Sequence, residues 1–307
     1  MRVLVFGAGA IGSFLGAMLS SQHEVFLVGR KMHVEKIRAE GLRIEGGIEK
    51  TVKVEAGEKI EGGNWDFVFL TTKAYDTRNA VREILAAVNK GTIVSLQNGL
   101  NNLEVIEEEV KASGKNFEIG ACITSIGVTF LEPGKIRFNG WGRTVVGSSN
   151  QNVAAALSKM LSDAGIQTEI CTNILNEIWV KGVINSAINP LTVIFNVKNG
   201  LLVRDPNLLS ILVSVAKESE SVGKAAGYIG QDVDCNGLTI KVAHQTAENY
   251  SSMLQDVMKG KRTEIMEING YIVDVAERLG MPAPLNKFLV RAVSAIQSTG
   301  RWIRREI

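Results

Sequence analysis

Apolar residues in the first half of the chain gather into short runs that alternate with segments of helical periodicity. Four runs are rich in β-branched or aromatic residues and predict central strands, at residues 3–6, 25–28, 67–70 and 93–96. Three segments predict helices, at residues 11–19, 34–39 and 75–88. Because strands and helices alternate, we expect a parallel sheet with helices on both faces.

The pattern changes between residues 119 and 146, where longer strand-like runs flank the sequence Glu132-Pro133-Gly134. A turn of this kind predicts antiparallel strands added to the sheet. A further helix at residues 153–164 and a further strand at residues 167–171 are expected to follow.

Beyond residue 172 the pattern is almost wholly helical. The periodicity predicts helices at residues 175–188, 208–226, 238–258, 263–279 and 284–298. The alternative for Asn189 is a turn residue before Pro190, where the first of these helices would end. We therefore expect an α/β Rossmann-type dinucleotide-binding domain over residues 1–171, followed by an all-α C-terminal domain over residues 172–307. A short basic tail is expected to be solvated; it contains Arg301, Arg304 and Arg305.

Composition and charge narrow the class of protein. The chain is 45% apolar and 21% charged, with a net charge of only +2, which gives no reason to expect nucleic acid or an anionic membrane as a partner. Three widely separated cysteines (Cys122, Cys171 and Cys235) are typical of reduced thiols, and the three histidines are too scattered for a metal site. Glycines interrupt the apolar N-terminal run, which argues against a secretory signal. We expect a soluble, cytoplasmic protein.

A glycine motif opens the chain. Gly7, Gly9 and Gly12 follow the first strand and begin the first helix, as in a dinucleotide-binding fingerprint. The first glycine suits a tight turn, the second a close approach to a pyrophosphate, and the third close packing of helix on strand. The residues expected to contact the cofactor here are Gly7, Ala8, Gly9, Ala10, Ile11 and Gly12.

The end of the second strand indicates which dinucleotide is bound. An NAD site has a carboxylate there for the ribose 2′-hydroxyl, whereas this chain has Arg30 and Lys31. A guanidinium suits a 2′-phosphate through charge-assisted hydrogen bonds, so NADP(H) is favoured over NAD(H). The alternative for Arg30 is a solvated surface side chain.

Two polar turns, at residues 71–74 and 97–99, also follow strands at the edge where ligands bind.

Polar residues recur at helical spacing in the apolar second half. Lys181, Asn185 and Asn189 are four residues apart, which stacks them on one helix face in an otherwise apolar segment. Asn249 and Ser252 have helical spacing too, and with Asp256 would form a second polar stripe. An unpaired ammonium is costly in a buried helix, so a polar substrate is a good candidate to meet the first stripe. The alternative is a lysine whose ammonium reaches water.

These residues together resemble the ketopantoate reductase (2-dehydropantoate 2-reductase) family nearly end to end. The shared motifs are Gly7-x-Gly9-x-x-Gly12, Arg30, Thr72-Lys73-Ala74, Asn98-Gly99, Trp179-x-Lys181-x-x-x-Asn185-x-x-x-Asn189-Pro190, Asn249-Tyr-Ser-Ser252-Met-Leu-Gln-Asp256, Arg262-Thr-Glu264-Ile and Asn269-Gly270. Members of the family reduce ketopantoate to (R)-pantoate with NADPH, on the route to pantothenate and coenzyme A. Many members have His where this chain has Gln97.

The resemblance implies a role for each residue. Lys181 would be the general acid that protonates the ketone oxygen, and Glu264 would orient that lysine or the substrate. Lys73 and Asn98 would lie beside the nicotinamide ribose. The substrate's hydroxyl and carboxylate would be held by Asn185, Asn189, Asn249 and Ser252.

Two other functions stay open. One is a reductase of another branched 2-oxo acid, because one methylene in a pocket is worth only about 1–3 kcal/mol. The other is a non-catalytic NADP(H)-sensing protein, which would need Arg30 but not Lys181, Asn185 and Glu264 together. Their joint presence favours catalysis.

Two apolar segments, residues 211–215 and 271–275, suit a homodimer interface as well as a core.

Overall fold

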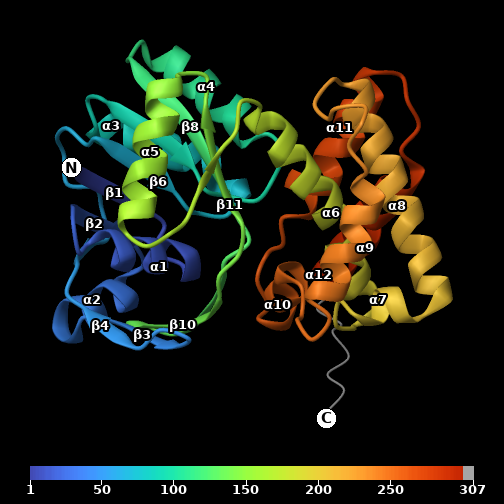
Figure 1. Cartoon of the computed structure of the whole chain (residues 1–307), viewed down its shortest axis with the longest axis horizontal. Helices are drawn as coiled ribbons and strands as arrows, with labels where there is room; N and C mark the ends of the chain where they lie inside the picture. Colours follow the sequence, from blue (N-terminus) through green and yellow to red (C-terminus); the bar gives the residue numbers. More distant parts are fainter. Residues whose placement is uncertain (300–307) are drawn as a thin grey trace. The chain divides into compact units, whose positions relative to one another are not determined.

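The computed structural model describes residues 1–299 and divides into two compact units (Figure 1). The first unit comprises Met1–Gln97 and Asn102–Ile174. The second comprises Asn98–Asn101 and the chain from Leu175 onward. The predicted basic tail lies outside the described residues. A four-residue piece of the first half thus belongs to the helical unit, which no local pattern indicates.

An eight-stranded sheet forms the centre of the first unit. In spatial order its strands are β12 (Glu169–Ile170), β11 (Thr144–Ser148), β8 (Phe117–Thr124), β7 (Gly91–Ser95), β6 (Phe67–Leu70), β1 (Arg2–Phe6), β2 (Glu24–Val28) and β5 (Glu55–Gly57). All neighbouring strands are parallel except β8 and β11. The four predicted central strands are therefore confirmed, as is an antiparallel addition after residue 119.

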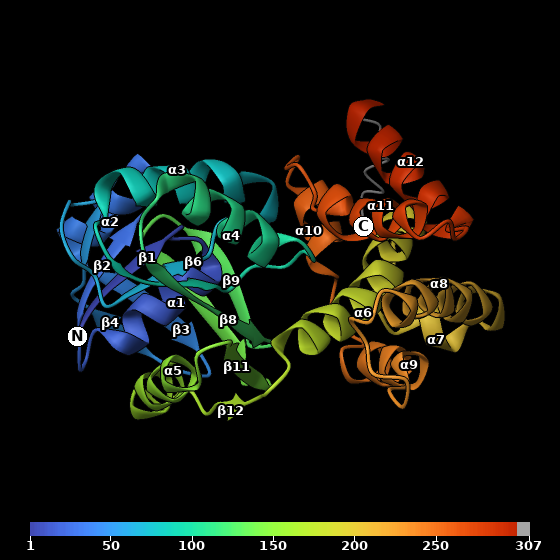
Figure 2. The same ribbon diagram turned by 90° about the horizontal axis from the view of Figure 1, so that it is seen from above.

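Helices cover both faces of this sheet because alternate strand residues are buried on opposite sides. Val3 and Val5 belong to the core under α1 (Ala10–Leu19) and α5 (Gln151–Asp163), while Leu4 belongs to the core under α3 (Thr77–Ala87) and α4 (Asn102–Ser113). Figure 2 shows these two helix layers on either side of the strands. The unit also contains α2 (Lys31–Glu40) and the 3₁₀ helix η1 (Ala74–Asp76). The α4 helix is not among the predicted elements.

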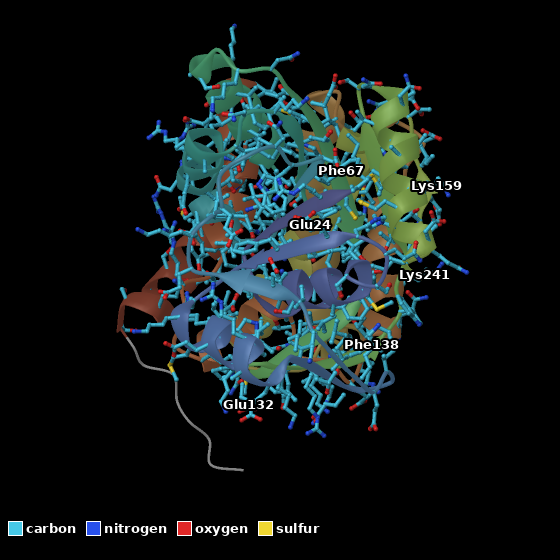
Figure 3. All side chains as sticks on the ribbon, turned by 90° about the vertical axis from the view of Figure 1, so that its left-hand side faces the viewer. Glu24, Phe67, Glu132, Phe138, Lys159 and Lys241 are labelled. Atoms are coloured by element: carbon cyan, nitrogen blue, oxygen red, sulfur yellow. The ribbon has the colours of Figure 1, made fainter. Side chains whose placement is uncertain are left out.

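A second sheet covers the outer side of α1. Its strand order is β4 (Lys50–Val52), β3 (Leu42–Gly46), β10 (Lys135–Gly140) and β9 (Gly127–Glu132). The antiparallel strands predicted around Glu132-Pro133-Gly134 are present, but they belong to this second sheet and not, as predicted, to the central one. The α1 helix contacts strands of both sheets, and Phe14 stacks on Phe138 with ring centroids 5.2 Å apart. Phe138 is labelled in Figure 3. Because α1 is packed from two sides, the glycine turn at its N-terminus is held in a fixed position.

A buried histidine joins α2 to α1 and to the turn between β9 and β10. The Nδ1 atom of His33 accepts a hydrogen bond from the Gly134 backbone N–H at 2.8 Å, so Nδ1 carries no proton. Its Nε2 atom lies 2.9 Å from the Ser13 hydroxyl oxygen and donates to it. Burial lowers the pKa of His33 below the ordinary value of 6.5.

We expect His33→Leu to lower the free energy of unfolding by about 1–3 kcal/mol at neutral pH, because it leaves two buried polar groups without partners. Since folding lowers the pKa of His33, the stability that this residue contributes is present above the unfolded-state pKa of 6.5 and is lost as the pH falls below it. Urea unfolding at neutral pH and near pH 5 should therefore show a weaker pH dependence for His33→Leu than for wild type. Equal pH dependence of unfolding in the two proteins would contradict the lowered pKa of His33.

The second unit is helical. Its elements are α6 (Ile174–Phe195), α7 (Leu201–Arg204), α8 (Pro206–Ala225), α9 (Cys235–Gln245), α10 (Ser252–Met258), the π-helical turn η2 (Met266–Gly270), α11 (Tyr271–Arg278) and α12 (Pro284–Thr299). Trp179, Val183 and Ala187 of α6 lie in its main core. The inner residues of the two segments proposed for a dimer interface, among them Leu212 and Ile272, are buried in that same core. An all-α C-terminal half is confirmed.

The predicted end of the first C-terminal helix at residue 188 is wrong, and Asn189 is not a turn residue, because α6 continues through Pro190 to Phe195. Within residues 1–299, α6 alone has the length and composition that would allow a membrane crossing. However, 61% of its most apolar window is buried inside the protein, as expected of a core helix.

The predicted helix at residues 238–258 is two helices in the structure, and the stripe containing Asn249, Ser252 and Asp256 is therefore not one helix face. The connecting segment pairs with residues before α7 instead. The Asn199 N–H donates to the Asn249 carbonyl and the Gly200 N–H donates to the Ala247 carbonyl, both at 3.0 Å. These tertiary hydrogen bonds replace the helical ones. The predicted helix at residues 263–279 begins at Ile265, one residue after Glu264, and its first turn is π-helical.

The three cysteines are free, with Cys122 and Cys235 buried and Cys171 half-buried. Burial raises the pKa of the Cys235 thiol to about 12, so this thiol stays protonated at neutral pH. Among residues 1–299, no group of three or more His, Cys, Asp and Glu side chains is arranged to hold a metal ion.

Candidate active site

The glycine motif forms the turn between β1 and α1. The backbone N–H groups of Gly7 and Ala8 both donate to the Val28 carbonyl at the end of β2, at 3.0 and 2.7 Å. Gly7 has φ of 115°, and a Cβ atom there would lie 2.7 Å from the Thr72 backbone nitrogen. At Gly12 a Cβ atom would collide with the Gly7 carbonyl oxygen. Glycine is therefore required at both positions.

The surroundings of Gly9 differ from those of the other two glycines. A Cβ atom at Gly9 would meet only the Gly7 carbonyl oxygen, 4.0 Å away, and the residue is exposed. The α1 helix begins at Ala10, and its first turn contains no acidic residue. No carboxylate there would repel an anion from the backbone N–H groups at the helix N-terminus. An open glycine beside a helix N-terminus is the arrangement that a pyrophosphate requires, and the loop therefore fits a dinucleotide.

Arg30 lies beside this loop. It is the exposed N-cap residue of α2, directly after β2. The preceding residue, Gly29, packs so tightly on the loop that a Cβ atom there would lie 2.8 Å from the Cβ of Ala8. The guanidinium is thus attached to a turn that touches the glycine loop. Lys31 is the first residue of α2 and lies 4.0 Å from Glu35, one helical turn further along.

The turn that carries Lys73 is hydrogen-bonded to the residues that follow β1 on one side and β7 on the other. The Thr71 hydroxyl donates to the Gly7 carbonyl at 2.7 Å. The amide of Gln97, at the end of β7, lies 3.0 Å from both the Thr72 carbonyl oxygen and the Thr77 hydroxyl oxygen. Sequence reasoning gave no role to Gln97. Its amide, at the position where many family members have His, links this turn to the end of β7.

The segment Asn98–Asn101 contacts other parts of the helical unit at three places. The Asn98 amide donates to a carboxylate oxygen of Glu264 at 3.4 Å, and the Leu100 N–H donates to the Glu267 carbonyl at 3.1 Å. The Leu100 side chain packs directly on Gly182, where a Cβ atom would overlap it. Gly182 follows Lys181 on α6. One short segment therefore contacts both Glu264 and the α6 turn that carries Lys181.

Three of the predicted site residues share one face of α6. Because the helix is continuous from Ile174 to Phe195, Lys181, Asn185 and Asn189 lie above one another along it. Asn189 is 5% exposed, whereas Lys181 and Asn185 are half-buried. Glu264, also 5% exposed, lies just before the helical turn that begins at Ile265. The polar stripe is thus present, and its most C-terminal member is the most deeply buried.

Asn249 and Ser252 are both exposed, one in the connecting segment and the other at the start of α10. Between them, Ser251 is 5% exposed and caps α10 by accepting from the Leu254 N–H at 3.1 Å. Its hydroxyl also lies 2.6 Å from the Thr192 hydroxyl of α6. Sequence reasoning missed Ser251, although a serine before an apolar helical run is an ordinary N-cap signal. Through these two contacts, Ser251 fixes the N-terminus of α10, where Ser252 lies, against α6.

Comparison with known proteins finds relatives that span nearly the whole chain. The family model described as ketopantoate reductase PanE/ApbA matches residues 3–151, and its C-terminal counterpart matches residues 173–297. The 2-dehydropantoate 2-reductase of Pyrococcus horikoshii is 39% identical over 304 residues, covering 98% of this chain and 99% of the relative. This chain belongs to the ketopantoate reductase family. The family resemblance and the fold class predicted from the sequence are thereby confirmed.

Another relative and two solved structures extend the comparison. The 2-dehydropantoate 2-reductase of Archaeoglobus fulgidus is 37% identical, covering 97% of this chain and 98% of the relative. The crystal structure of a PanE/ApbA family ketopantoate reductase from Ralstonia eutropha JMP134 matches with a TM-score of 0.89 and 31% identity, over 98% of this chain and all of that one. A ternary structure of D-mandelate dehydrogenase with NADH and anilino(oxo)acetate matches with a TM-score of 0.87 and 25% identity, over 98% and 100% of the two chains.

Proposed function

We propose that this protein is an NADP-dependent 2-dehydropantoate 2-reductase, which reduces 2-dehydropantoate (ketopantoate) to (R)-pantoate in pantothenate and coenzyme A biosynthesis. One observation carries the proposal: relatives of that name align with 97–98% of this chain at 37–39% identity. The alignment spans both units. We assign cofactor binding to residues 1–171, and substrate binding and catalysis to residues 172–307.

The cofactor in this proposal is NADP(H). The residues that would hold it are Gly7, Ala8, Gly9, Ala10, Ile11, Gly12, Arg30, Lys73 and Asn98. The open position at Gly9 supports the pyrophosphate assignment, and the exposed Arg30 beside the loop supports a 2′-phosphate. Lys73 is held on its turn by the neighbouring Gln97 contacts. When bound, the reduced nicotinamide supplies a hydride.

Reduction of a ketone also needs a proton at the oxygen, where negative charge develops. We assign this proton to the ammonium of Lys181. As the hydride bonds to the carbonyl carbon, the C–O π electrons move to the oxygen and take the lysine proton, which gives the alcohol. Lys181 then regains a proton from water. Its half-buried position on α6 limits the competition from solvent.

Glu264 and the asparagines would orient the reactants. The Glu264 carboxylate is nearly buried and accepts from Asn98, which supports a fixed orientation toward Lys181 or the substrate. Asn185, Asn189, Asn249 and Ser252 would hold the substrate's hydroxyl and carboxylate. Asparagine suits these positions because it offers both a donor and an acceptor without adding charge.

A second candidate function is the reduction of a different 2-oxo acid. The observation that favours it is the match to D-mandelate dehydrogenase, whose structure holds NADH and anilino(oxo)acetate. The same architecture therefore accommodates another 2-oxo acid and another dinucleotide in that relative.

The two candidates are separated by following NADPH oxidation at 340 nm with purified protein. We expect rapid oxidation with 2-dehydropantoate and slow oxidation with phenylglyoxylate and with the 2-oxo acid that lacks the substrate's hydroxyl. Faster turnover of either comparison acid would move the assignment to the second candidate. NADPH binding without turnover of any 2-oxo acid would favour the sensing protein instead.

We further propose that the protein acts in the cytoplasm on a small diffusible substrate, with neither nucleic acid nor membrane as a partner. Homodimer formation stays a prediction, and sedimentation equilibrium of the purified chain would test it.

A further inference from the structure

Pro190 lies inside α6, where a proline removes a backbone hydrogen bond. A regular α-helix would use the N–H of residue 190 to bind the Ser186 carbonyl, and proline has no N–H. Ser186 is fully buried, so its carbonyl cannot turn to water. A proline in a helix interior costs about 3 kcal/mol or more unless another group compensates. Nevertheless, α6 continues for five residues beyond it, to Phe195.

The compensating group is the side chain of Asn269. Its Nδ2 atom donates to the Ser186 carbonyl at 2.9 Å, and it donates to the Asn286 carbonyl oxygen Oδ1 at 2.9 Å as well. Asn286 is fixed in turn, because its backbone and side-chain nitrogens both donate to Glu218. Asn269 is fully buried. Its donor groups are therefore both used, on two different helices.

The acceptor side of Asn269 is not satisfied. Its Oδ1 atom is buried without a hydrogen-bond partner among the residues that the structure describes. An unsatisfied buried carbonyl costs about 1–3 kcal/mol, so this side chain is a poor choice for stability alone. The contribution of Asn269 is therefore its two donor contacts, to the Ser186 carbonyl and to Asn286.

Asn269 belongs to the π-helical turn η2, in which the Tyr271 N–H reaches back five residues to the Met266 carbonyl. The same stretch of chain begins with Glu264 and accepts the Leu100 N–H at Glu267. A π turn contains one residue more than an α-helical turn, so it changes the direction in which the preceding side chains point. Such turns are frequent at functional sites. Asn269 thus joins the stretch that carries Glu264 to the α6 turn between Asn185 and Asn189.

We propose that Asn269 is a positioning residue for the reduction. By replacing the hydrogen bond that Pro190 removes, it fixes the α6 turn that carries Asn185 and Asn189 in register with Glu264. This inference rests on the proposed function for its kinetic consequence, but the contact itself does not. Asn269 is not placed against substrate or cofactor, so it acts through the residues that it holds.

The test is Asn269→Leu, which keeps the volume and removes the donor. We expect kcat/KM for 2-dehydropantoate to fall by about 10–100-fold, since a displacement of about 1 Å at such groups can cost 10²-fold. The dissociation constant of NADPH, from its fluorescence, should stay within about twofold. The matched control is Ser219→Ala, which removes the hydroxyl 2.8 Å from the Ser186 hydroxyl in the same buried network but leaves the Ser186 carbonyl bonded. It should lower stability and leave kcat/KM unchanged.

Rescue distinguishes positioning from general packing. Pro190→Ala returns a helical N–H to the Ser186 carbonyl, so Pro190→Ala/Asn269→Leu should recover kcat/KM by at least about fivefold over Asn269→Leu. If Asn269→Leu alone does not fold, the double variant should fold and be active. A wild-type kcat/KM in Asn269→Leu, or a double variant no better than the single one, would overturn the proposal.

Failure of the proposed function would be recognised separately, as wild-type protein that does not reduce 2-dehydropantoate. Hydrogen exchange then provides a test that needs no activity. Amides of α6 after Pro190 should exchange at least about tenfold faster in Asn269→Leu than in wild type and return toward the wild-type rate in the double variant. Unchanged exchange in Asn269→Leu would overturn the inference.

Discussion

Lys181→Ala is expected to lower kcat for NADPH-dependent reduction of 2-dehydropantoate by about 10³–10⁴-fold, near the upper end of the range for loss of a general acid. The reason is that the substituted site has no proton donor for the oxygen that becomes negative as the hydride is transferred. NADPH binding should change by less than about twofold, because every residue assigned to the dinucleotide except Asn98 belongs to the other unit of the chain. Single-turnover kinetics and NADPH fluorescence would measure the two effects separately.

Lys241→Ala is the matched control, since Lys241 is an exposed lysine on α9 of the same unit (Figure 3). It removes the same charge and should leave kcat unchanged. Added methylammonium should partly restore turnover in Lys181→Ala, because a small cation acid can enter the space left by the side chain. A Lys181→Ala protein with kcat within tenfold of wild type would show that another group donates the proton.

The sequence predicts most of the first unit because its strands are buried on both faces and need little context. Runs such as residues 67–70 are apolar throughout, and β6 (Phe67–Leu70) has those bounds. The small sheet is different. Its strands β3 and β10 pair in parallel although they are far apart along the chain, and β4 has exposed residues at two of three positions. The alternating burial of β3 and β10 is that of half-buried strands, but no local pattern shows that these two strands pair with each other in a separate sheet.

The missed features of the helical unit have the same physical origin. Proline at position 190 locally predicts a helix end. That prediction fails because the Asn269 amide binds the Ser186 carbonyl, 83 positions away along the chain. The helix predicted at residues 238–258 is broken by hydrogen bonds to Asn199 and Gly200. Apolar periodicity continues across that break, so the pattern alone cannot reveal it.

The candidate site could be predicted as a set of residues but not as an arrangement. Spacing places Lys181, Asn185 and Asn189 on one face, because helix geometry alone determines that. The contact between Asn98 and Glu264 joins residues 166 positions apart, and the sequence had given Asn98 to the cofactor only. Gln97 and Asn269 donate to backbone carbonyls of other elements, a role that leaves no periodic signature in sequence.

Arg30→Asp is expected to lower the ratio of kcat/KM for NADPH to kcat/KM for NADH by about 10²–10³-fold. Each charge-assisted hydrogen bond from the guanidinium to a 2′-phosphate is worth about 1.5–3 kcal/mol, and a carboxylate at this position would instead repel the phosphate and accept from a 2′-hydroxyl. The structurally similar D-mandelate dehydrogenase holds NADH, which has no 2′-phosphate. Steady-state kinetics with both cofactors would measure the ratio.

Lys31→Asp makes the same change of charge one residue later, at a position that is also exposed. If the preference comes from a direct contact between Arg30 and the phosphate, Lys31→Asp should lower the ratio by less than about fivefold, because its effect is limited to long-range attraction screened by salt. Raising the ionic strength should then reduce the effect of Lys31→Asp and leave most of the effect of Arg30→Asp. Equal losses in the two variants would mean that the cofactor is selected by the overall positive charge at the start of α2, and the assignment of Arg30 would be wrong.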